Sequence, residues 1–384
     1  MDALFQREFV VDDDLIHLNH AGVAPWPRRC ADAVQRFAET MCRRSYAGSF
    51  PGWLETEQRL RERLARLINA RSADDVAVLK NTSDALAQVA RGLEWQRGDS
   101  VVVLAEEFVS NLVAWEALAD RGVDLVRVAP ADGETPEAAL ERACDGRTRL
   151  VSVSTVQYGT GTRIDVARLG AFCRGRGVLF CVDAVQSLGA LRFDAVAAHA
   201  DFVVAGAHKW LMSPFGVALF WCRPNLRDAL KPLAHGWHTL ADPLRFAGTL
   251  AEIEPSARRF ESGTANWAGI LGFEATLSLF EEIGAVEIER RVLNNASWLA
   301  DAFAGRERVS LVSPRAPGRF GGSVCIAVDG LDHAAIAERL EADGVLCAAR
   351  GSALRFSAHC YTPRDKLERA LQSFDRACYA LNTV

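Results

Sequence analysis

Side chains capable of acid–base and covalent chemistry follow several apolar segments of the sequence. His208 and Lys209 stand in the middle of FVVAGAHKWLMSPFGVALFW (residues 202–221), and Asp183 and Gln186 follow VLFCV. A lysine that is shielded from water has a lowered pKa and therefore a free amine. A carboxylate at the end of an apolar strand is costly unless it meets a cation. Taken singly, His208 and Lys209 are explained more simply as part of a solvated loop, and Asp183 as part of a structural ion pair.

A candidate phosphate site lies earlier in the chain. Asn81-Thr82-Ser83 follows DVAVLK and opens a stretch with helical spacing. Hydroxyls and free N–H groups at a helix N-terminus bind anions, although an N-cap alone explains the same residues. The combination of a phosphate cradle, an aspartate, a glutamine and a shielded lysine, each at a strand end, matches what pyridoxal phosphate requires. In this interpretation Lys209 is where the cofactor is attached.

The elements that must position these side chains are predicted by the apolar patterning. From about residue 75, short valine-rich segments alternate with segments of helical spacing, which is typical of a mostly parallel, helix-covered α/β sheet. In such sheets ligands bind at the carboxyl ends of the strands. The expected strands are DVAVL, SVVVL, VDLVRVA, TRLVSVSTV, VLFCVDA, DFVVAG and GVALFW.

The chain is expected to divide into three parts. A short N-terminal segment (1–20) and a large cofactor-binding domain (21–255) precede a smaller α+β domain (256–384), in which SVCIAV and ALRFSA alternate with two helical segments. A helix that starts near Gly269 is expected to continue past Gly284. Its predicted end is Phe303. Other helices are expected at residues 28–42 and 53–70, and residues 231–254, which lack a clear period, are expected to cover a site as a loop.

Composition excludes several classes of function. The chain has 384 residues, of which 49% are hydrophobic and 24% charged, and its net charge of −5 leaves no basic surface for nucleic acid. A membrane span over residues 202–221 is disfavoured, because a central lysine costs about 2.5–3.5 kcal/mol. The acidic N-terminus and the ten scattered cysteines favour a reduced, cytoplasmic protein. His235 and His238 lack a third ligand nearby, so no metal site is expected.

The sequence resembles the class V aminotransferase-like group of fold-type I pyridoxal-phosphate enzymes. The resemblance runs from LNHAGVAP (residues 18–25) to LRFSAHCYT (residues 354–362), and VDAVQSLGA followed by AHKW is its most specific part. The group includes cysteine desulfurases, selenocysteine lyases, kynureninases and isopenicillin N epimerase-like proteins. The resemblance implies a large domain with a helix-covered sheet and a smaller C-terminal domain.

The resemblance also implies roles for individual residues. Lys209 resembles the Schiff-base lysine, Asp183 the partner of the pyridine nitrogen, and Gln186 the group beside the ring hydroxyl. Phe108 occupies the position whose side chain stacks on the ring, although a phenylalanine there could also be an ordinary core residue. Gln157 is expected near the ring hydroxyl, with a one-residue ambiguity, or else capping a turn. The remaining cofactor residues are the phosphate ligands Thr82, Ser83 and His208, and the stacking residue Phe108.

Two further residues concern the substrate, and one concerns a partner. Arg355 in LRFSAH resembles the arginine that holds a substrate carboxylate with two hydrogen bonds, although a surface strand would also explain it. His20 is a candidate for the substrate site or an ordinary loop histidine. Thr264 in ESGTANW resembles a residue that reaches the phosphate of the neighbouring subunit, which implies a homodimer with active sites at the subunit interface.

The sequence departs from cysteine desulfurases at two functional positions. Those enzymes place a histidine over the cofactor ring and a mobile nucleophilic cysteine ahead of the carboxylate-binding arginine. Here Phe108 cannot transfer protons, and Cys347 lies in VLCAA, which is expected to be a buried strand where a thiol is inert. Gly206 also replaces a phosphate-binding serine of many relatives. Desulfurase activity is therefore disfavoured.

The reaction itself is left open by the sequence. An α-amino acid is the expected substrate, and transamination or C–S or C–Se lyase chemistry is the leading expectation. The alternatives are cysteine desulfurase, isopenicillin N epimerase-like racemase or epimerase, and kynureninase-like hydrolase. From another class, a non-catalytic scaffold on the same fold has no need of Lys209, Asp183 and Arg355 together. A nicotinamide-binding protein would need a GxGxxG motif after its first strand, which is not present.

Overall fold

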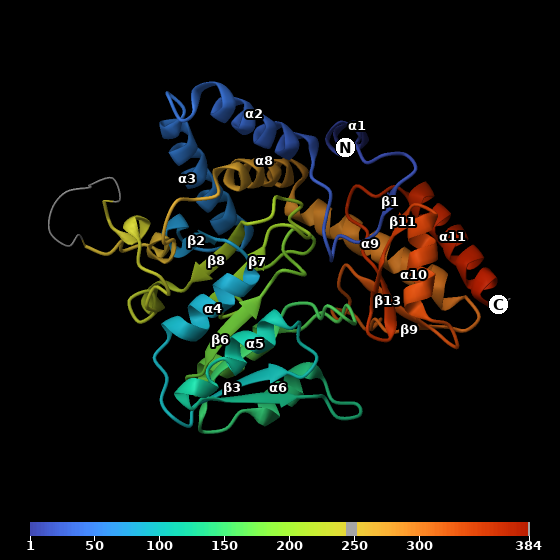
Figure 1. Ribbon diagram of the computed structural model, residues 1–384. Helices are drawn as coiled ribbons and strands as arrows, with labels where there is room; N and C mark the ends of the chain where they lie inside the picture. Colours follow the sequence, from blue (N-terminus) through green and yellow to red (C-terminus); the bar gives the residue numbers. More distant parts are fainter. Residues whose placement is uncertain (243–251, 383–384) are drawn as a thin grey trace.

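The largest feature of the computed structural model, which describes residues 1–242 and 252–382, is a seven-stranded sheet (Figure 1). Its strand order is β2-β8-β7-β6-β5-β3-β4. β8 runs antiparallel to both neighbours, and all the other pairs are parallel, which confirms the predicted α/β sheet. The strands are β2 (Val76–Leu79), β3 (Ser100–Leu104), β4 (Asp124–Val128), β5 (Thr148–Ser154), β6 (Leu179–Asp183), β7 (Phe202–Gly206) and β8 (Ala218–Cys222).

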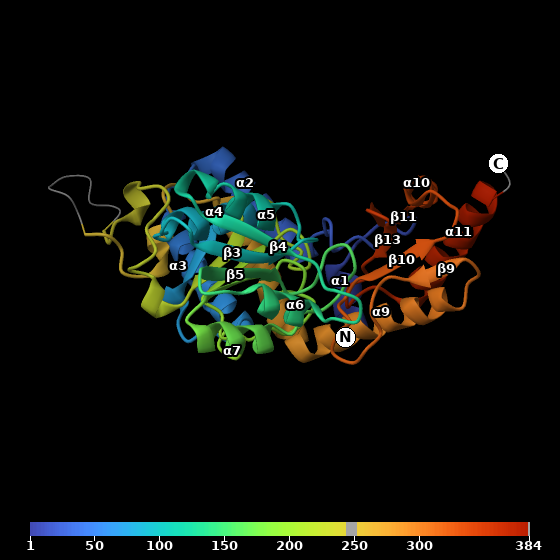
Figure 2. The same ribbon diagram turned by 90° about the horizontal axis from the view of Figure 1, so that it is seen from below.

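Helices cover both faces of this sheet, because successive side chains of a strand point to opposite faces. Val101 and Val103 of β3 belong to the core beneath α4 and α5, whereas Val102 belongs to the core formed with α3, α6, α7 and α8. Figure 2 shows α4 and α5 on one side of the sheet and α6 and α7 on the other. These helices are α3 (Phe50–Leu67), α4 (Thr82–Gly92), α5 (Ser110–Glu116), α6 (Pro136–Ala143), α7 (Val166–Arg176) and α8 (Trp267–Ile283).

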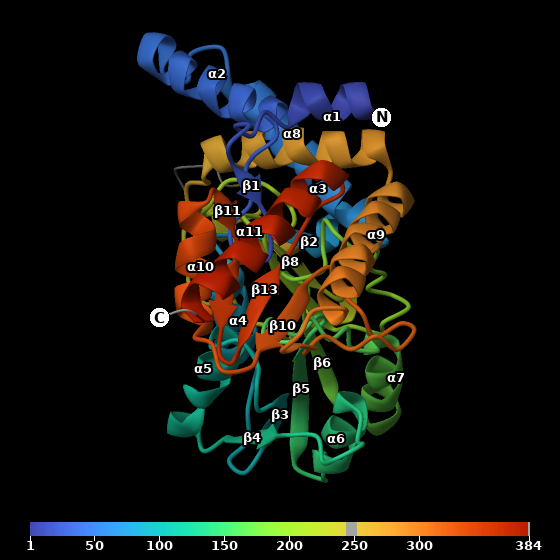
Figure 3. The same cartoon turned by 90° about the vertical axis from the view of Figure 1, so that its right-hand side faces the viewer.

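A smaller lobe follows α8 and has its own apolar core (Figure 3). Its antiparallel sheet has the order β12-β13-β10-β9. The N-terminal segment joins this lobe, because β1 (Ile16–His17) pairs in parallel with β11 (Val345–Leu346). The other elements of this lobe are α9 (Ala285–Ala304), β9 (Val309–Leu311), β10 (Val324–Val328), α10 (His333–Ala342), β12 (Ala348–Arg350), β13 (Ala353–Phe356) and α11 (Arg364–Asn382). The first helix, α1 (Asp2–Glu8), packs instead against the core of the large sheet through Phe5.

The helices of the structure differ from the prediction at Gly284. The helix expected to continue past this residue is in fact two helices, α8 and α9. Gly284 has φ 88°, a backbone conformation that suits glycine and that an α-helix cannot contain. The helices predicted before the sheet are present as α2 (Arg28–Arg44) and α3.

Two other expectations concern the segment around the lysine and the loop after it. Residues 202–221 form the adjacent strands β7 and β8, and none of the described helices is long and apolar enough to cross a membrane. The loop predicted at residues 231–254 contains one 3₁₀ turn, η4 (Trp237–Thr239), in its described part, and residues 243–251 lie outside the described chain. The other 3₁₀ turns are η1 (Ala73–Asp75), η2 (Ala119–Arg121), η3 (Pro224–Leu226) and η5 (Ala257–Phe260).

Candidate active site

The loop that carries the lysine begins at the carboxyl end of β7, where ligands bind in α/β sheets. Lys209 is half-buried, and its Nζ lies 5.2 Å from the centre of the Phe108 ring. Burial lowers the pKa of Lys209 to about 8, the charges of Arg355 and Arg350 add to this shift, and Asp183 opposes it. In a fraction of the molecules, Lys209 is therefore a neutral, nucleophilic amine near neutral pH.

The carboxylate of Asp183 ends the neighbouring strand β6 and is buried. Its Oδ1 accepts a hydrogen bond of 2.9 Å from the N–H of Val185. Burial raises the pKa of Asp183 to about 7, and the charge of Glu107 adds to the shift, whereas the Val185 N–H and Lys209 oppose it. In the described chain this carboxylate forms no ion pair within 4 Å, so a cationic group such as a protonated ring nitrogen would offset the cost of its burial.

The predicted phosphate ligands lie at the N-terminus of α4, next to the end of β7. Thr82 is the first residue of the helix, and its Oγ1 accepts a hydrogen bond of 2.9 Å from the N–H of Gly206. Ser83 Oγ lies 2.8 Å from Ser110 Oγ at the start of α5. The two helix N-termini therefore meet beside the lysine loop, where their hydroxyls and free N–H groups suit an anion.

His208 and Gly206 complete this end of the site. Burial lowers the pKa of His208 to about 4, and the charge of Lys209 adds to the shift, so the imidazole is neutral near pH 7. A neutral imidazole offers a phosphate an N–H donor but no charge. A Cβ at Gly206 would lie 3.1 Å from Thr82 Oγ1 and 3.2 Å from the His208 ring, so the serine of many relatives would crowd both neighbours.

Phe108 lies beside the lysine and not in the core. Its side chain is 39% exposed, which excludes the alternative of core packing. The ring makes an edge contact with Tyr158, with a centroid distance of 5.4 Å, and one face is turned toward Lys209 Nζ. This arrangement offers an apolar surface next to the lysine, as stacking on an aromatic cofactor requires.

Glu107, which sequence reasoning missed, holds Gln157 in place. This buried carboxylate accepts hydrogen bonds from the N–H and hydroxyl of Ser154 and, at 3.0 Å, from Gln157 Nε2. The opposite side-chain atom, Gln157 Oε1, is buried and has no partner in the described chain. A hydroxyl of a bound ring could donate the hydrogen bond that Gln157 Oε1 lacks. The signal that could have revealed Glu107 is an acidic residue soon after the strand SVVVL.

Gln186 and His20 connect the N-terminal segment to the lysine loop. Gln186 Nε2 donates to Ala21 O at 3.0 Å, and its Oε1 accepts from Trp210 Nε1 at 3.0 Å, which leaves one N–H for a ring hydroxyl. His20 is fully buried, and its ring nitrogens lie 2.8 Å from Ser357 O and from the Tyr361 hydroxyl. Both ring nitrogens of His20 are therefore engaged with other residues of the described chain.

Arg355 brings an unpaired positive charge into the site. Its side chain is 2% exposed and comes from β13 of the smaller lobe. NH1 donates to Tyr158 O at 3.0 Å, NH2 lies 3.5 Å from Asn19 Oδ1, and Nε has no partner. Burial lowers the pKa of Arg355 to about 10, and in the described chain the guanidinium forms no ion pair within 4 Å. An unpaired buried charge is costly, and a substrate carboxylate would offset that cost.

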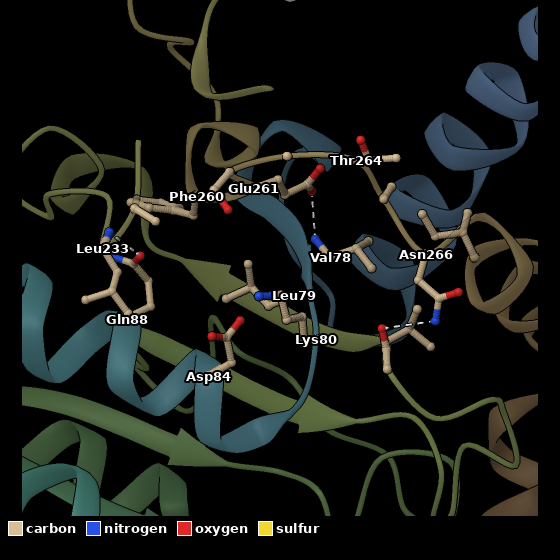
Figure 4. Close-up of a pocket in the computed structure, with 17 residues that line it drawn as sticks. Val78, Leu79, Lys80, Asp84, Gln88, Leu233, Phe260, Glu261, Thr264 and Asn266 are labelled. Carbon is tan, nitrogen blue, oxygen red and sulfur yellow. Dashed lines mark hydrogen bonds between the residues drawn. The ribbon is translucent and has the colours of Figure 1, made fainter. Parts of the chain in front are cut away.

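Thr264 lies in a pocket beside the N-terminus of α4, the helix that carries Thr82 and Ser83. It lines a pocket of about 430 Å³ together with Lys80 and Asp84, next to the N-terminus of α4, and Figure 4 shows it on the segment that follows Glu261. Lys209 and Phe108 do not line this pocket.

These geometries fit pyridoxal phosphate. A buried carboxylate without a cation, a helix N-terminus with two hydroxyls, an exposed aromatic face and a lysine with a lowered pKa surround one loop. In that order, these groups match the ring nitrogen, the phosphate, the ring face and the aldehyde of that cofactor. Within the described residues, no group of three or more His, Cys, Asp or Glu side chains could hold a metal ion.

Sequence comparisons relate the chain to enzymes of known type. It matches the model of the family described as aminotransferase class-V over residues 16–370. It is 31% identical over 366 residues to a probable cysteine desulfurase of Methanothermobacter thermautotrophicus, which covers 94% of this chain and 88% of the relative. It is also 30% identical over 320 residues to an uncharacterized aminotransferase of Bacillus subtilis, covering 83% of each chain.

Solved structures share the fold. A cysteine desulfurase from Thermococcus onnurineus superposes with a TM-score of 0.86 at 23% identity, covering 100% of this chain and 98% of that chain. A cystine C–S lyase solved with its product, cysteine persulfide, superposes with a TM-score of 0.87 at 22% identity, covering 94% of this chain and 98% of that chain. These likenesses establish the architecture of the two lobes.

Proposed function

Because the chain belongs to the aminotransferase class-V family of pyridoxal-phosphate enzymes, we propose that it breaks the C–S bond of a sulfur-containing α-amino acid. The sulfur would leave as hydrogen sulfide from cysteine or as a persulfide from cystine, and water would convert the remaining three-carbon fragment to pyruvate and ammonia. Names of relatives support a sulfur-containing substrate, since they include a probable cysteine desulfurase and a cystine C–S lyase. Transamination, the other reaction expected from the sequence, is distinguished by its products.

One observation favours a lyase over a desulfurase: the described chain places no reactive thiol beside Arg355. Cys347, the cysteine that precedes β12, is half-buried, and burial raises the pKa of its thiol to about 12. A thiol is a poor nucleophile in that state. β12 and β13 are joined by a tight turn in which Gly351 has φ 56°, so there is no long loop to carry a mobile cysteine. Sulfur would therefore leave with the product and not be transferred to the enzyme.

Each residue of the site has a separate role in the proposed reaction. The bound cofactor supplies an electron sink for bond breaking at the substrate's α- and β-carbons. Asp183 holds a proton on the ring nitrogen, and Thr82 and Ser83 hold the phosphate. Arg355 binds the substrate carboxylate, which orients the α-carbon toward the lysine. Lys209 Nζ takes the α-proton, a task for which an amine with a pKa of about 8 is suited.

A homodimer completes this proposal. Thr264 would contact the cofactor phosphate of the other subunit, since in its own subunit it lies apart from Lys209. Phe215, Leu233 and Trp237 expose large apolar side chains on the lysine loop and the following segment, where a second copy would cover them.

The ten cysteines are free in the structure, which supports a reducing compartment such as the cytoplasm.

The proposal is tested by product analysis on a panel of amino acids. The cofactor-loaded protein is given cysteine, cystine, alanine, kynurenine and both enantiomers of each, and all products are quantified. We expect pyruvate and ammonia in equal amounts from cysteine or cystine, with hydrogen sulfide released from cysteine and cysteine persulfide released from cystine. Alanine as the carbon product would instead establish a desulfurase, a keto acid without C–S cleavage a transaminase, and an inverted amino acid a racemase.

The Cys347→Ala variant separates the two sulfur reactions. We expect its rate of C–S cleavage to stay within a few-fold of the parent, because the buried thiol takes no part in the proposed reaction. Cys378→Ala is the matched control, since Cys378 is also half-buried and lies on α11. Loss of sulfur release in the Cys347 variant alone would replace the lyase by a desulfurase.

A further inference from the structure

A second pocket lies at the opposite edge of the large sheet from the candidate active site. It has a volume of about 300 Å³ and sits where β7 begins and β8 ends, whereas Lys209 follows the end of β7. A strand of five residues spans roughly 16 Å, so the pocket is separate from the site already described. Its polar lining residues are Arg71, Asp75, Arg174, His199, Trp221, Arg223 and Asn225.

The pocket has an excess of positive charge. Arg71 and Arg174 form no ion pair within 4 Å in the part of the chain that the structure describes, although the charge of Arg174 does act on Asp201 over a longer distance. Arg223 is paired, because its Nε lies 2.8 Å from Asp201 Oδ1. The one carboxylate among the lining residues is Asp75, which lies 3.6 Å from Arg227 NH1. Two arginines are therefore left at the rim for a negative ligand.

Two residues that line the pocket, Trp221 and His199, carry buried hydrogen-bonding atoms without a partner in the described chain. Trp221 is 3% exposed, and its Nε1, which can only donate, has no acceptor in the described chain. His199 Nδ1 is also buried without a partner, and the residue has φ 50°, a conformation that is rare for a side chain of this size. A buried donor without an acceptor costs about 1–3 kcal/mol. An indole N–H and an imidazole thus line the same pocket as two unpaired guanidinium groups.

We propose that this pocket binds a small oxyanion, a phosphate or a carboxylate. The oxyanion accepts the N–H of Trp221 and pairs with Arg71 and Arg174, and His199 offers a further contact. Both oxyanions have the geometry that a guanidinium fork matches with two hydrogen bonds. The ligand joins α7, the segment after α3 and strand β8, so its binding stabilises the large domain. This site is independent of the reaction at Lys209.

The test measures the thermal stability of the holoenzyme, whose cofactor is first fixed by borohydride so that its own phosphate site stays filled. Inorganic phosphate and acetate are added in separate titrations, with chloride at equal ionic strength as the reference. We expect a saturable rise in Tm with at least one of the two oxyanions, and the more effective one identifies the ligand class. Equal curves for both oxyanions and chloride would overturn the proposal.

Variants locate the effect in this pocket. Arg174→Gln should weaken the anion affinity roughly ten-fold, the size expected for one charge-assisted hydrogen bond. The matched control is Arg176→Gln, which removes the same charge two residues later on α7, where Arg176 contacts Phe172 instead. Affinity that falls equally in both variants would show general charge screening and refute a built site.

Trp221→Phe gives an independent readout, because it removes the N–H and keeps most of the ring. Without added oxyanion, Tm reflects the gain from losing an unpaired buried donor and the opposing cost of the cavity that the smaller ring leaves in the core. With oxyanion, the affinity should fall roughly ten-fold. An unchanged affinity in a folded Trp221→Phe variant would contradict the proposed contact.

Discussion

Replacing Asp183 by asparagine is expected to lower kcat by roughly 10²- to 10³-fold, as loss of a preorganised electrostatic contact typically does. The asparagine can still accept the Val185 N–H bond that the Asp183 Oδ1 accepts now, so the fold should persist. What it loses is the negative charge that would keep the ring nitrogen protonated. The measurement is kcat per bound cofactor, together with the absorption spectrum of the cofactor.

Asp201→Asn is the matched control for this variant. Asp201 is also a buried carboxylate that accepts a backbone N–H bond, from Phe180 at 2.8 Å, but it lies at the opposite edge of the sheet. Both variants should fold, because asparagine can accept the same backbone N–H bond, and only the Asp183 variant should lose turnover. Near-normal kcat in Asp183→Asn would remove this residue from the proposed mechanism.

Arg355→Lys is expected to raise KM for the amino acid roughly 10- to 100-fold, the range for a lost hydrogen bond between charged groups. A lysine keeps the charge, but its ammonium cannot make the two parallel bonds of a guanidinium fork. The absorption of the cofactor without substrate should stay the same, because the predicted role of Arg355 is toward the substrate alone. Titration of the cofactor spectrum with substrate measures the change.

The control for the arginine is Arg339→Lys, an exposed position on α10 of the same lobe. It should leave KM unchanged. A simple amine without a carboxylate should bind the parent and the Arg355 variant equally, because it has no group for the guanidinium. If removing the carboxylate from the ligand cost nothing in the parent, Arg355 would not be the substrate clamp.

The sheet of the large domain could be predicted from the sequence because its strands are buried on both faces. Runs such as SVVVL and VLFCV, rich in valine and without polar alternation, became β3 and β6, and the polar residues after the strands met at one edge. The extent of the helix around Gly284 could not be predicted, because glycine inside helical spacing is compatible with both a continuous helix and a break. Only the backbone conformation decides between them.

The parts of the site that the sequence did not reveal depend on contacts between distant residues. Glu107 acts through Gln157, which lies 50 positions later, and Asn19 reaches Arg355 across 336 positions. Neither contact leaves a local pattern. The same is true of His20, whose position in the LNHAGVAP stretch suggested a substrate contact, whereas the fold engages both of its nitrogens with Ser357 and Tyr361.

Attachment of the cofactor at Lys209 is the claim on which the rest of the account depends, and one measurement tests it directly. The cofactor-loaded protein is reduced with borohydride, digested, and mapped by mass spectrometry. We expect the pyridoxyl group on Lys209 alone, because this lysine combines a lowered pKa with a position beside Asp183 and Phe108. The other lysines of the chain are Lys80, Lys231 and Lys366. A pyridoxyl group on any of these, with Lys209 unmodified, would contradict the account.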